Sequence, residues 1–159
     1  MYKRQDYIKE KFRNKRQNSI EEFQTLRLSN KFKDRFQNHE KISDEELLEN
    51  ARAFIESLPF VGLVDDFDRS VELLISFLKP AFPEFKGREF KANVLQDLSL
   101  SQEQKRAQIK QELSAEIFEE VIARNSLDES VYQIGRAHFE KLYGANEQTS
   151  GEKAAWSLF

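Results

Sequence analysis

The hydrophobic pattern changes from strand-like to helix-like at one place in the chain, between residues 58 and 78. Residues 60–64 form a continuous apolar run with two β-branched valines, which is typical of a strand buried on both faces in a parallel sheet. Three aspartates follow. Apolar residues then recur from Val71 at the i, i+3, i+4 and i+7 positions of an amphipathic helix, which Pro80 ends. The pattern therefore predicts a strand, an acidic turn and a helix.

Helical periodicity dominates most of the remaining chain. Two predicted helices begin with a capping box, in which a serine and a glutamate three residues later satisfy each other's free backbone amides: Ser19 with Glu22, and Ser43 with Glu46. Ser101 caps another predicted helix. Besides the helix after the acidic turn, the predicted helices span Asp6–Gln17, Ser19–Arg27, Ser43–Leu58, Ser101–Arg124 and Leu127–Gly144.

Two polar segments lack this periodicity, residues 28–42 and residues 80–94. Both are predicted to be loops, the second with one short strand near Phe90–Val94. A buried strand needs partners on both edges to satisfy its backbone amides and carbonyls. Since Phe60–Val64 has one poor neighbour in this sequence, the sheet that it predicts is incomplete.

The composition suits one globular domain and excludes several classes of site. The chain has 159 residues, of which 39% are apolar and 14 are phenylalanine, enough for a hydrophobic core. No apolar run reaches the roughly 20 residues that cross a bilayer, so we expect a soluble chain without membrane contact. An anchor upstream of Met1 stays open. The absence of cysteine excludes disulfides, thiolate nucleophiles and cysteine-ligated zinc, and leaves the compartment unknown.

Positive charge is concentrated at the start of the chain. Residues 1–41 contain 12 Lys and Arg against 6 Asp and Glu, and the remaining residues contain 13 against 22. The basic N-terminal helix, residues 1–18, is either a solvated helix face or a surface for phosphate, sulfate or nucleic acid. Residues 1–5 are either an ordinary basic start or a translated sequencing adapter joined to a partial gene.

Short stretches between residues 19 and 143 carry a family resemblance through their order and spacing. They are Ser19–Phe23, Asn30–Phe36, Glu46-Leu47, Phe60–Leu63, Phe67–Ser70, Leu73-Leu74, Lys91–Val94 and Asn125–Tyr132. Together they resemble the C-terminal half of a carbohydrate-type sulfotransferase. The last of them has the asparagine, aspartate and tyrosine pattern of that family's final helix.

The resemblance implies an α/β fold around a parallel sheet, of which this chain would be a mostly α-helical part with one or two short strands. The implied reaction transfers a sulfuryl group from 3′-phosphoadenosine 5′-phosphosulfate to a carbohydrate hydroxyl, and it needs no metal. Residues 19–144 would be the C-terminal part of the domain, and residues 145–159 a flexible tail. The sequence contains no recognisable phosphosulfate-binding loop or catalytic base. We therefore expect both upstream, no catalytic residue here and an inactive fragment.

Two sets of polar residues are candidate contacts on this resemblance. The candidate nucleotide contacts are Arg88, Lys91 and Asn93, because a late loop of the family closes over the adenosine and a guanidinium matches phosphate geometry. The candidate acceptor contacts, facing an anionic sugar, are Lys31, Lys33, Arg35 and His39. Ordinary loop charges are the alternative interpretation of both sets.

The three aspartates of the acidic turn, Asp65, Asp66 and Asp68, have two interpretations. They could be metal ligands or a general base. Carboxylates at a helix N-terminus are also stabilised by the helix dipole and by capping, and we interpret them in this way.

A second function belongs to a different class. The chain could be a helical interaction module whose basic N-terminal helices bind an acidic partner or nucleic acid. The sulfotransferase interpretation expects no nucleic acid. A closed helical bundle with Phe60–Val64 packed inside would favour the interaction module, and an isolated extended segment would favour the sulfotransferase fragment.

Overall fold

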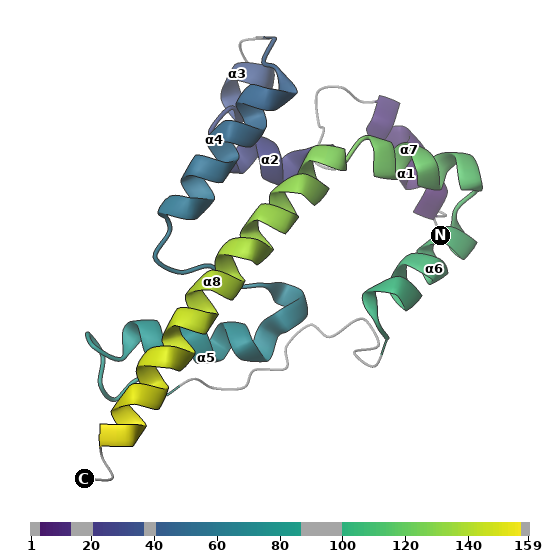
Figure 1. Cartoon of the computed structure of the whole chain (residues 1–159). Helices are drawn as coiled ribbons and strands as arrows, with labels where there is room; N and C mark the ends of the chain where they lie inside the picture. The colour runs from purple at the N-terminus through teal and green to yellow at the C-terminus, as the bar shows by residue number, and fades with distance from the viewer. Residues whose placement is uncertain (1–3, 14–20, 37–40, 87–99, 157–159) are drawn as a thin grey trace.

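The computed structural model describes residues 4–13, 21–36, 41–86 and 100–156. These residues form α-helices and one short 3-10 helix, with no strand among them. Helix α8 runs along the molecule, with α2, α4 and α5 against it and with α7 and α1 beyond its N-terminal end (Figure 1). Helix α6 lies to one side of the start of α8, where Arg106 pairs with Glu129. The elements are α1 (Arg4–Arg13), α2 (Phe23–Leu28), α3 (Phe32–Phe36), α4 (Asp44–Ser57), η1 (Val64–Asp66), α5 (Phe67–Leu78), α6 (Gln102–Glu112), α7 (Ala115–Ala123) and α8 (Ser126–Trp156).

The α/β expectation is wrong, because the described residues are helical and Phe60–Val64 is not a strand. The backbone is extended at Leu58 (φ −76°, ψ 129°) and at Leu63 (φ −110°, ψ 132°), and η1 then begins. No backbone-to-backbone hydrogen bond joins residues 59–62 to another segment of the described chain. The physical reason is the lack of a neighbouring strand there. The second predicted strand, Phe90–Val94, lies outside the described residues.

A serine replaces the missing strand at one point of this extended segment. The Ser70 hydroxyl accepts a hydrogen bond from the Leu63 amide at 2.7 Å, and it lies within donating distance of the Leu63 carbonyl at 3.1 Å and the Asp66 carbonyl at 2.8 Å. Ser70 of helix α5 therefore satisfies the Leu63 amide, and its single hydroxyl proton is shared between the two carbonyls. The apolar run lies against helices, with Leu63 buried and Val64 92% exposed.

The core lies along α8, whose apolar side chains recur about every turn. At its start Leu127 packs beside Leu26 of α2, and further on Val131 packs against Ala51 and Ile55 of α4. Three clusters follow one another along the helix. The buried residues are Leu26, Ile42 and Leu47 in the first, Ala51, Ile55 and Val131 in the second, and Leu63, Leu73 and Phe139 in the third.

Several helix boundaries follow from local capping. The serine half of the box predicted at Ser43 is confirmed, since the Ser43 hydroxyl accepts from the Glu46 amide at 3.2 Å. The glutamate half is wrong, because the Glu46 carboxylate pairs with Lys31. The predicted helix over Ser101–Arg124 is two helices, because the chain is extended at Leu113 and Ser114 caps α7. The expected end at Gly144 is also wrong, since α8 continues to Trp156.

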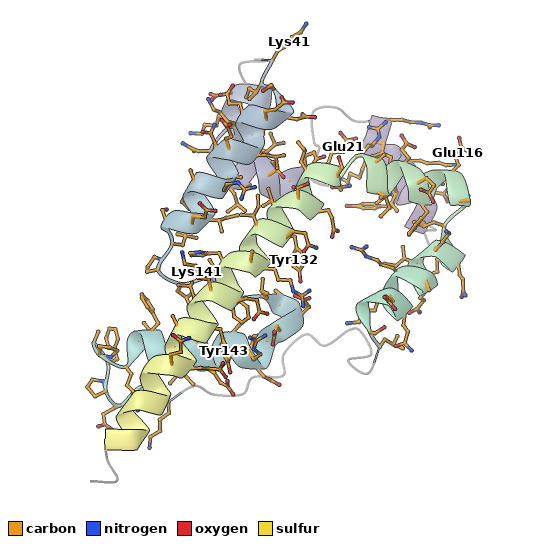
Figure 2. The ribbon with its side chains drawn as sticks, in the orientation of Figure 1. Glu21, Lys41, Glu116, Tyr132, Lys141 and Tyr143 are labelled. Carbon is orange, nitrogen blue, oxygen red and sulfur yellow. The ribbon has the colours of Figure 1, made fainter. Side chains whose placement is uncertain are left out.

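The surface carries both charged and large apolar side chains. Phe54 of α4 is 46% exposed, and Lys41, just before α4, extends away from the neighbouring helices (Figure 2). None of the described helices is apolar over enough of its length to span a membrane.

Candidate functional site

The N-terminal end of α2 is fixed by reciprocal capping with α8. The Glu22 carboxylate accepts hydrogen bonds from the Leu127 amide at 3.1 Å and the Asp128 amide at 2.8 Å. In return, Asp128 accepts from the Gln24 amide at 3.1 Å and from the Thr25 amide and hydroxyl, each at 2.7 Å. Each carboxylate thus satisfies free amides at the start of the other helix. The predicted local box with Ser19 assigned Glu22 the wrong amides, and Ser19 lies outside the described residues.

Burial affects the ionisation of this junction. Desolvation raises the pKa of the Glu22 carboxyl above its ordinary value, although its bonds to the Leu127 and Asp128 amides act in the opposite direction. The Thr25 side chain is fully buried, and its hydroxyl has its partner in Asp128. The hydrogen bonds of the junction therefore fix the orientation of α2 relative to α8.

The C-terminal end of α2 forms a tight turn. The Asn30 amide donates to the Arg27 carbonyl at 3.2 Å and the Lys31 amide donates to the Leu26 carbonyl at 3.1 Å, which is the bond pattern of a Schellman motif. The Asn30 backbone has a left-handed conformation, with φ 59°, which asparagine adopts more readily than most residues. The turn directs the chain into α3 and brings Phe32 back beside α2.

A shallow pocket lies at this turn, between α2 and α3. It has a volume of about 370 Å³ and is lined by Arg27, Asn30, Phe32 and Lys33. The Arg27 guanidinium stacks over the Phe32 ring at 3.9 Å from its centroid and lies 5.3 Å from that of Phe23. The two rings meet edge to face, with centroids 6.3 Å apart. Aromatic contacts thus hold the arginine in place.

The cations at this turn differ in whether a carboxylate pairs with them. Lys31 pairs with Glu46 at 3.1 Å and with Asp34 at 3.8 Å, so its charge is balanced by its own surroundings. Among the described residues, no carboxylate lies within ion-pair distance of Arg27 or Lys33. The guanidinium has five N–H donors in a fixed plane, and stacking leaves its edges available.

The structure separates the predicted acceptor contacts. It places Lys33 at the pocket and Lys31 in ion pairs. Arg35 belongs to α3, with its side chain outside the described part, and His39 lies outside it altogether. The predicted nucleotide contacts Arg88, Lys91 and Asn93 also fall outside the described residues.

Sequence reasoning missed Arg27 and Phe32 as pocket residues. Arg27 was interpreted as the last residue of an amphipathic helix, and Phe32 as an apolar residue of a loop. The available signal was Asn30, a residue common after helix ends, followed closely by a phenylalanine.

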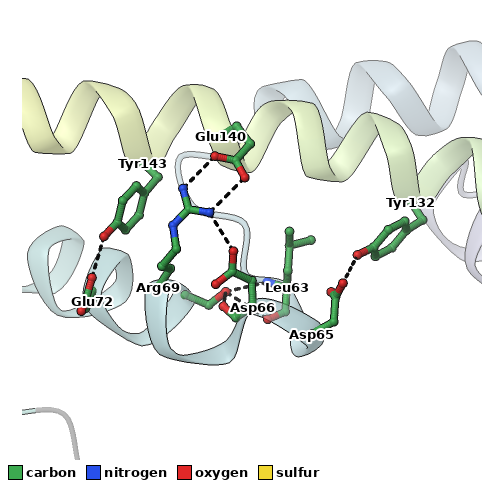
Figure 3. A network of polar contacts seen from close by, with 9 residues as sticks. Leu63, Asp65, Asp66, Arg69, Glu72, Tyr132, Glu140 and Tyr143 are labelled. Atoms are coloured by element: carbon green, nitrogen blue, oxygen red, sulfur yellow. Dashed lines mark hydrogen bonds and ion pairs between the residues drawn. The ribbon is translucent and has the colours of Figure 1, made fainter. Parts of the chain in front are cut away.

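A second polar cluster joins α5 and η1 to α8 (Figure 3). Arg69 donates to both carboxylate oxygens of Glu140, at 3.0 and 2.7 Å, and to Asp66 at 2.7 Å. Its guanidinium also lies 4.1 Å from the ring centroid of Tyr143, which donates to Glu72 at 2.7 Å. Tyr132 and Tyr143 extend from α8 on the side of α5 (Figures 2 and 3). These contacts tie Glu140 and Tyr143 of α8 to α5.

Two aspartates of the acidic turn, Asp65 and Asp66, bond side chains of other residues. Asp66 is the N-cap residue of α5, but its carboxylate bonds to Arg69 and makes no side-chain cap. Asp65 accepts from the Tyr132 hydroxyl, and burial, then this neighbour, raises the pKa of that hydroxyl. The capping interpretation is thus wrong for Asp66, and within the described ranges no three acidic or histidine side chains are grouped as metal ligands.

Comparisons with known proteins give little guidance to function. No family of known proteins matches the chain, and no solved structure matches it. An uncharacterized protein of Archaeoglobus fulgidus is 31% identical over 81 residues, which are 51% of this chain and 32% of that protein. The aligned part thus spans about a third of the relative's length.

Proposed function

We propose that residues 19–144 are the C-terminal, helical part of a sulfotransferase that transfers a sulfuryl group from 3′-phosphoadenosine 5′-phosphosulfate to a carbohydrate hydroxyl. The proposal is supported by the convergence on α8 of separate stretches that carry the sequence resemblance. Glu22, from the first stretch, bonds the start of α8, and Arg69, from the Phe67–Ser70 stretch, bonds Glu140 in its middle. Stretches distant in the sequence thus form one framework.

The proposal divides the reaction between this chain and the rest of a longer protein. In-line sulfuryl transfer needs cations placed where negative charge develops on the leaving phosphate oxygen. A phosphosulfate-binding loop would supply these cations and a catalytic base would accept the proton of the acceptor hydroxyl, both from outside this chain, so the chain alone is expected to be inactive. The helices around α8 would hold the acceptor side.

The test uses the longer relative from Archaeoglobus fulgidus. Full-length protein is incubated with radiolabelled 3′-phosphoadenosine 5′-phosphosulfate and a panel of polysaccharides, and transfer of label is measured. We expect transfer to at least one polysaccharide, and none by the present chain alone. A relative that neither binds adenosine 3′,5′-bisphosphate nor transfers label would contradict the proposal. Tight binding of that nucleotide by the present chain would contradict the division.

A second candidate is supported by the way the apolar run packs. Leu63 is buried in the third cluster, Phe60 packs against it and Val61 packs against the second, all within helical surroundings. This arrangement suits a helical interaction module that binds an acidic partner through basic α1, where Lys9 and Arg13 are exposed. Replacing both with glutamine should then abolish salt-dependent retention on immobilised DNA. Unchanged retention, or none by the wild type, would reject the module.

A further inference from the structure

We infer that the pocket between α2 and α3 binds the sulfate or carboxylate group of an acidic sugar chain, with Arg27 and Lys33 as the anion-binding residues. This inference rests on the proposed function and names the class of acceptor. It also replaces the acceptor residues expected from the sequence, since it adds Arg27, Asn30 and Phe32 and assigns Lys31 a structural role.

The first support is that Arg27 is positioned without being neutralised. Arg69, Arg106 and Arg124 each bond a carboxylate, whereas Arg27 is held by the Phe23 and Phe32 rings. Aromatic stacking fixes the plane of a guanidinium and leaves its edge donors to form the paired bonds that planar oxyanions accept. The cost of ordering this side chain is thus met before a ligand arrives.

The second support is the local charge. The nearby carboxylates of Asp34 and Glu46 both pair with Lys31, which leaves one net negative charge among these three groups. Arg27 and Lys33 add two positive charges, so the turn as a whole carries one net positive charge. Lys33 adds an exposed ammonium to the pocket, and the Asn30 side chain adds amide hydrogen-bonding groups. The pocket is therefore cationic although the chain as a whole carries a formal charge of −3.

The shape of the pocket favours an acidic sugar over nucleic acid. Its volume of about 370 Å³ is near the lower end of the roughly 300–1,000 Å³ of ligand pockets, which suits a sugar unit of a chain. Single-stranded nucleic acid is bound by stacking bases on open aromatic faces along a basic groove. Here Arg27 covers one face of Phe32, and Phe23 meets this ring edge to face.

The test is calorimetric titration of the whole chain with a sulfated, uronate-containing tetrasaccharide. Arg27→Gln should weaken binding about tenfold or more, because a charge-assisted pair of hydrogen bonds is lost. Phe32→Leu keeps the charge and removes the stacking, and should weaken binding roughly two- to fivefold. Arg52→Gln is the matched control: it removes the same charge from an exposed arginine of α4, which pairs with Glu56 at 3.7 Å, and should leave binding unchanged. Thermal melting of each variant checks that it folds.

Three further ligands separate the sources of the anion. Inorganic sulfate alone should bind the wild type far more weakly than the tetrasaccharide does. A single-stranded DNA of equal charge should bind the wild type and the Arg27→Gln variant with the same affinity. Equal binding of sulfate and tetrasaccharide would overturn the sugar contact, and equal losses in Arg27→Gln and Arg52→Gln would overturn the pocket. An unsulfated uronate tetrasaccharide that binds in an Arg27-dependent manner would identify the carboxylate as the anion.

The two proposals can fail separately. If the longer relative transfers sulfuryl groups while Arg27→Gln binds the tetrasaccharide as the wild type does, the pocket inference fails and the proposed function stands. If the pocket binds in an Arg27-dependent manner but the relative has no transferase activity, the proposed function fails and the binding site stands.

Discussion

The two ends of α2 differ in whether their charged side chains have hydrogen-bonding partners within the described fold. At its start, Glu22 and Asp128 bond backbone amides of α8 and α2 across the junction, and the buried Thr25 hydroxyl has its partner. At its end, Arg27 is held by phenylalanine rings and, among the described residues, has no carboxylate partner. A polar group whose bonding capacity is filled within the fold stabilises the fold. A cation held in place with free donors is available for a ligand.

The largest expected loss of stability comes from removing a hydrogen-bond partner at the N-terminal end of α2. Asp128→Ala removes three hydrogen bonds and leaves the Thr25 hydroxyl buried without its partner, so the free energy of unfolding should fall by roughly 2–4 kcal/mol. Urea denaturation measures it. Asp68→Ala, at an exposed aspartate of α5, is the control and should cost about 1 kcal/mol or less. Equal losses in the two variants would contradict the reciprocal capping.

Ser70 tests whether polar groups that are hydrogen-bonded within the fold also stabilise it outside α2. Ser70→Ala removes the hydroxyl that accepts from the Leu63 amide and lies within donating distance of the Leu63 carbonyl, and should lower the free energy of unfolding by about 1–2 kcal/mol. Ser130→Ala removes an exposed hydroxyl that bonds within α8, and should change it by less than about 0.5 kcal/mol. A Ser70 variant as stable as the wild type would mean that the extended segment needs no anchor.

The pH dependence of stability should have opposite signs at two carboxylates that contact or belong to α8. Desolvation raises the pKa of Glu22, so its contribution is present below its ordinary pKa and is lost as pH rises through the raised value. The hydrogen bond from Arg69 lowers the pKa of Glu140, so its contribution is present above its ordinary pKa and is lost as pH falls.

Unfolding free energies of the wild type, Glu22→Gln and Glu140→Gln from about pH 3 to pH 7 measure both signs. The difference between the wild type and Glu22→Gln should shrink as pH rises, while that for Glu140→Gln should grow. Two differences of the same sign would contradict the assignment of burial to one carboxyl and of ion pairing to the other.

The smallest expected effect on stability distinguishes two lysines of the turn. Lys33→Gln should change the free energy of unfolding by less than about 0.5 kcal/mol, because Lys33 is exposed and has no ion pair among the described residues. It should nevertheless weaken tetrasaccharide binding severalfold. Lys31→Gln should do the reverse, losing up to about 1 kcal/mol of stability with little change in binding. Both are measured by denaturation and calorimetry.

Local signals in the sequence predicted the structure better than long-range ones. The Ser43 cap was predictable because its partner, Glu46, is three residues away. The role of Glu22 was not, because its partners follow about a hundred residues later. The same limit explains the wrong strand, since an apolar run such as Phe60–Val64 packs equally well against helices when no strand lies beside it.

The basic segment after residue 28 contains the turn at which the pocket lies, and Lys33 is a residue of both. The other pocket residues were not predicted. Which cation is balanced and which is free depends on how α4 and the phenylalanine rings pack around the turn. Glu46 of α4 neutralises Lys31, and Phe32 positions Arg27, and neither relation has a signature in the sequence.

The most direct test measures both the free energy of unfolding and the affinity for the sulfated tetrasaccharide in each of two variants, one at either end of α2. Asp128→Ala should lose unfolding free energy and, at a temperature where it stays folded, bind the sulfated tetrasaccharide nearly as the wild type does. Arg27→Gln should keep its stability within about 1 kcal/mol, the size of an exposed cation–π contact, and lose about tenfold in affinity. If stability and affinity fall together in both variants, the separation between a structural end and a binding end of α2 is wrong.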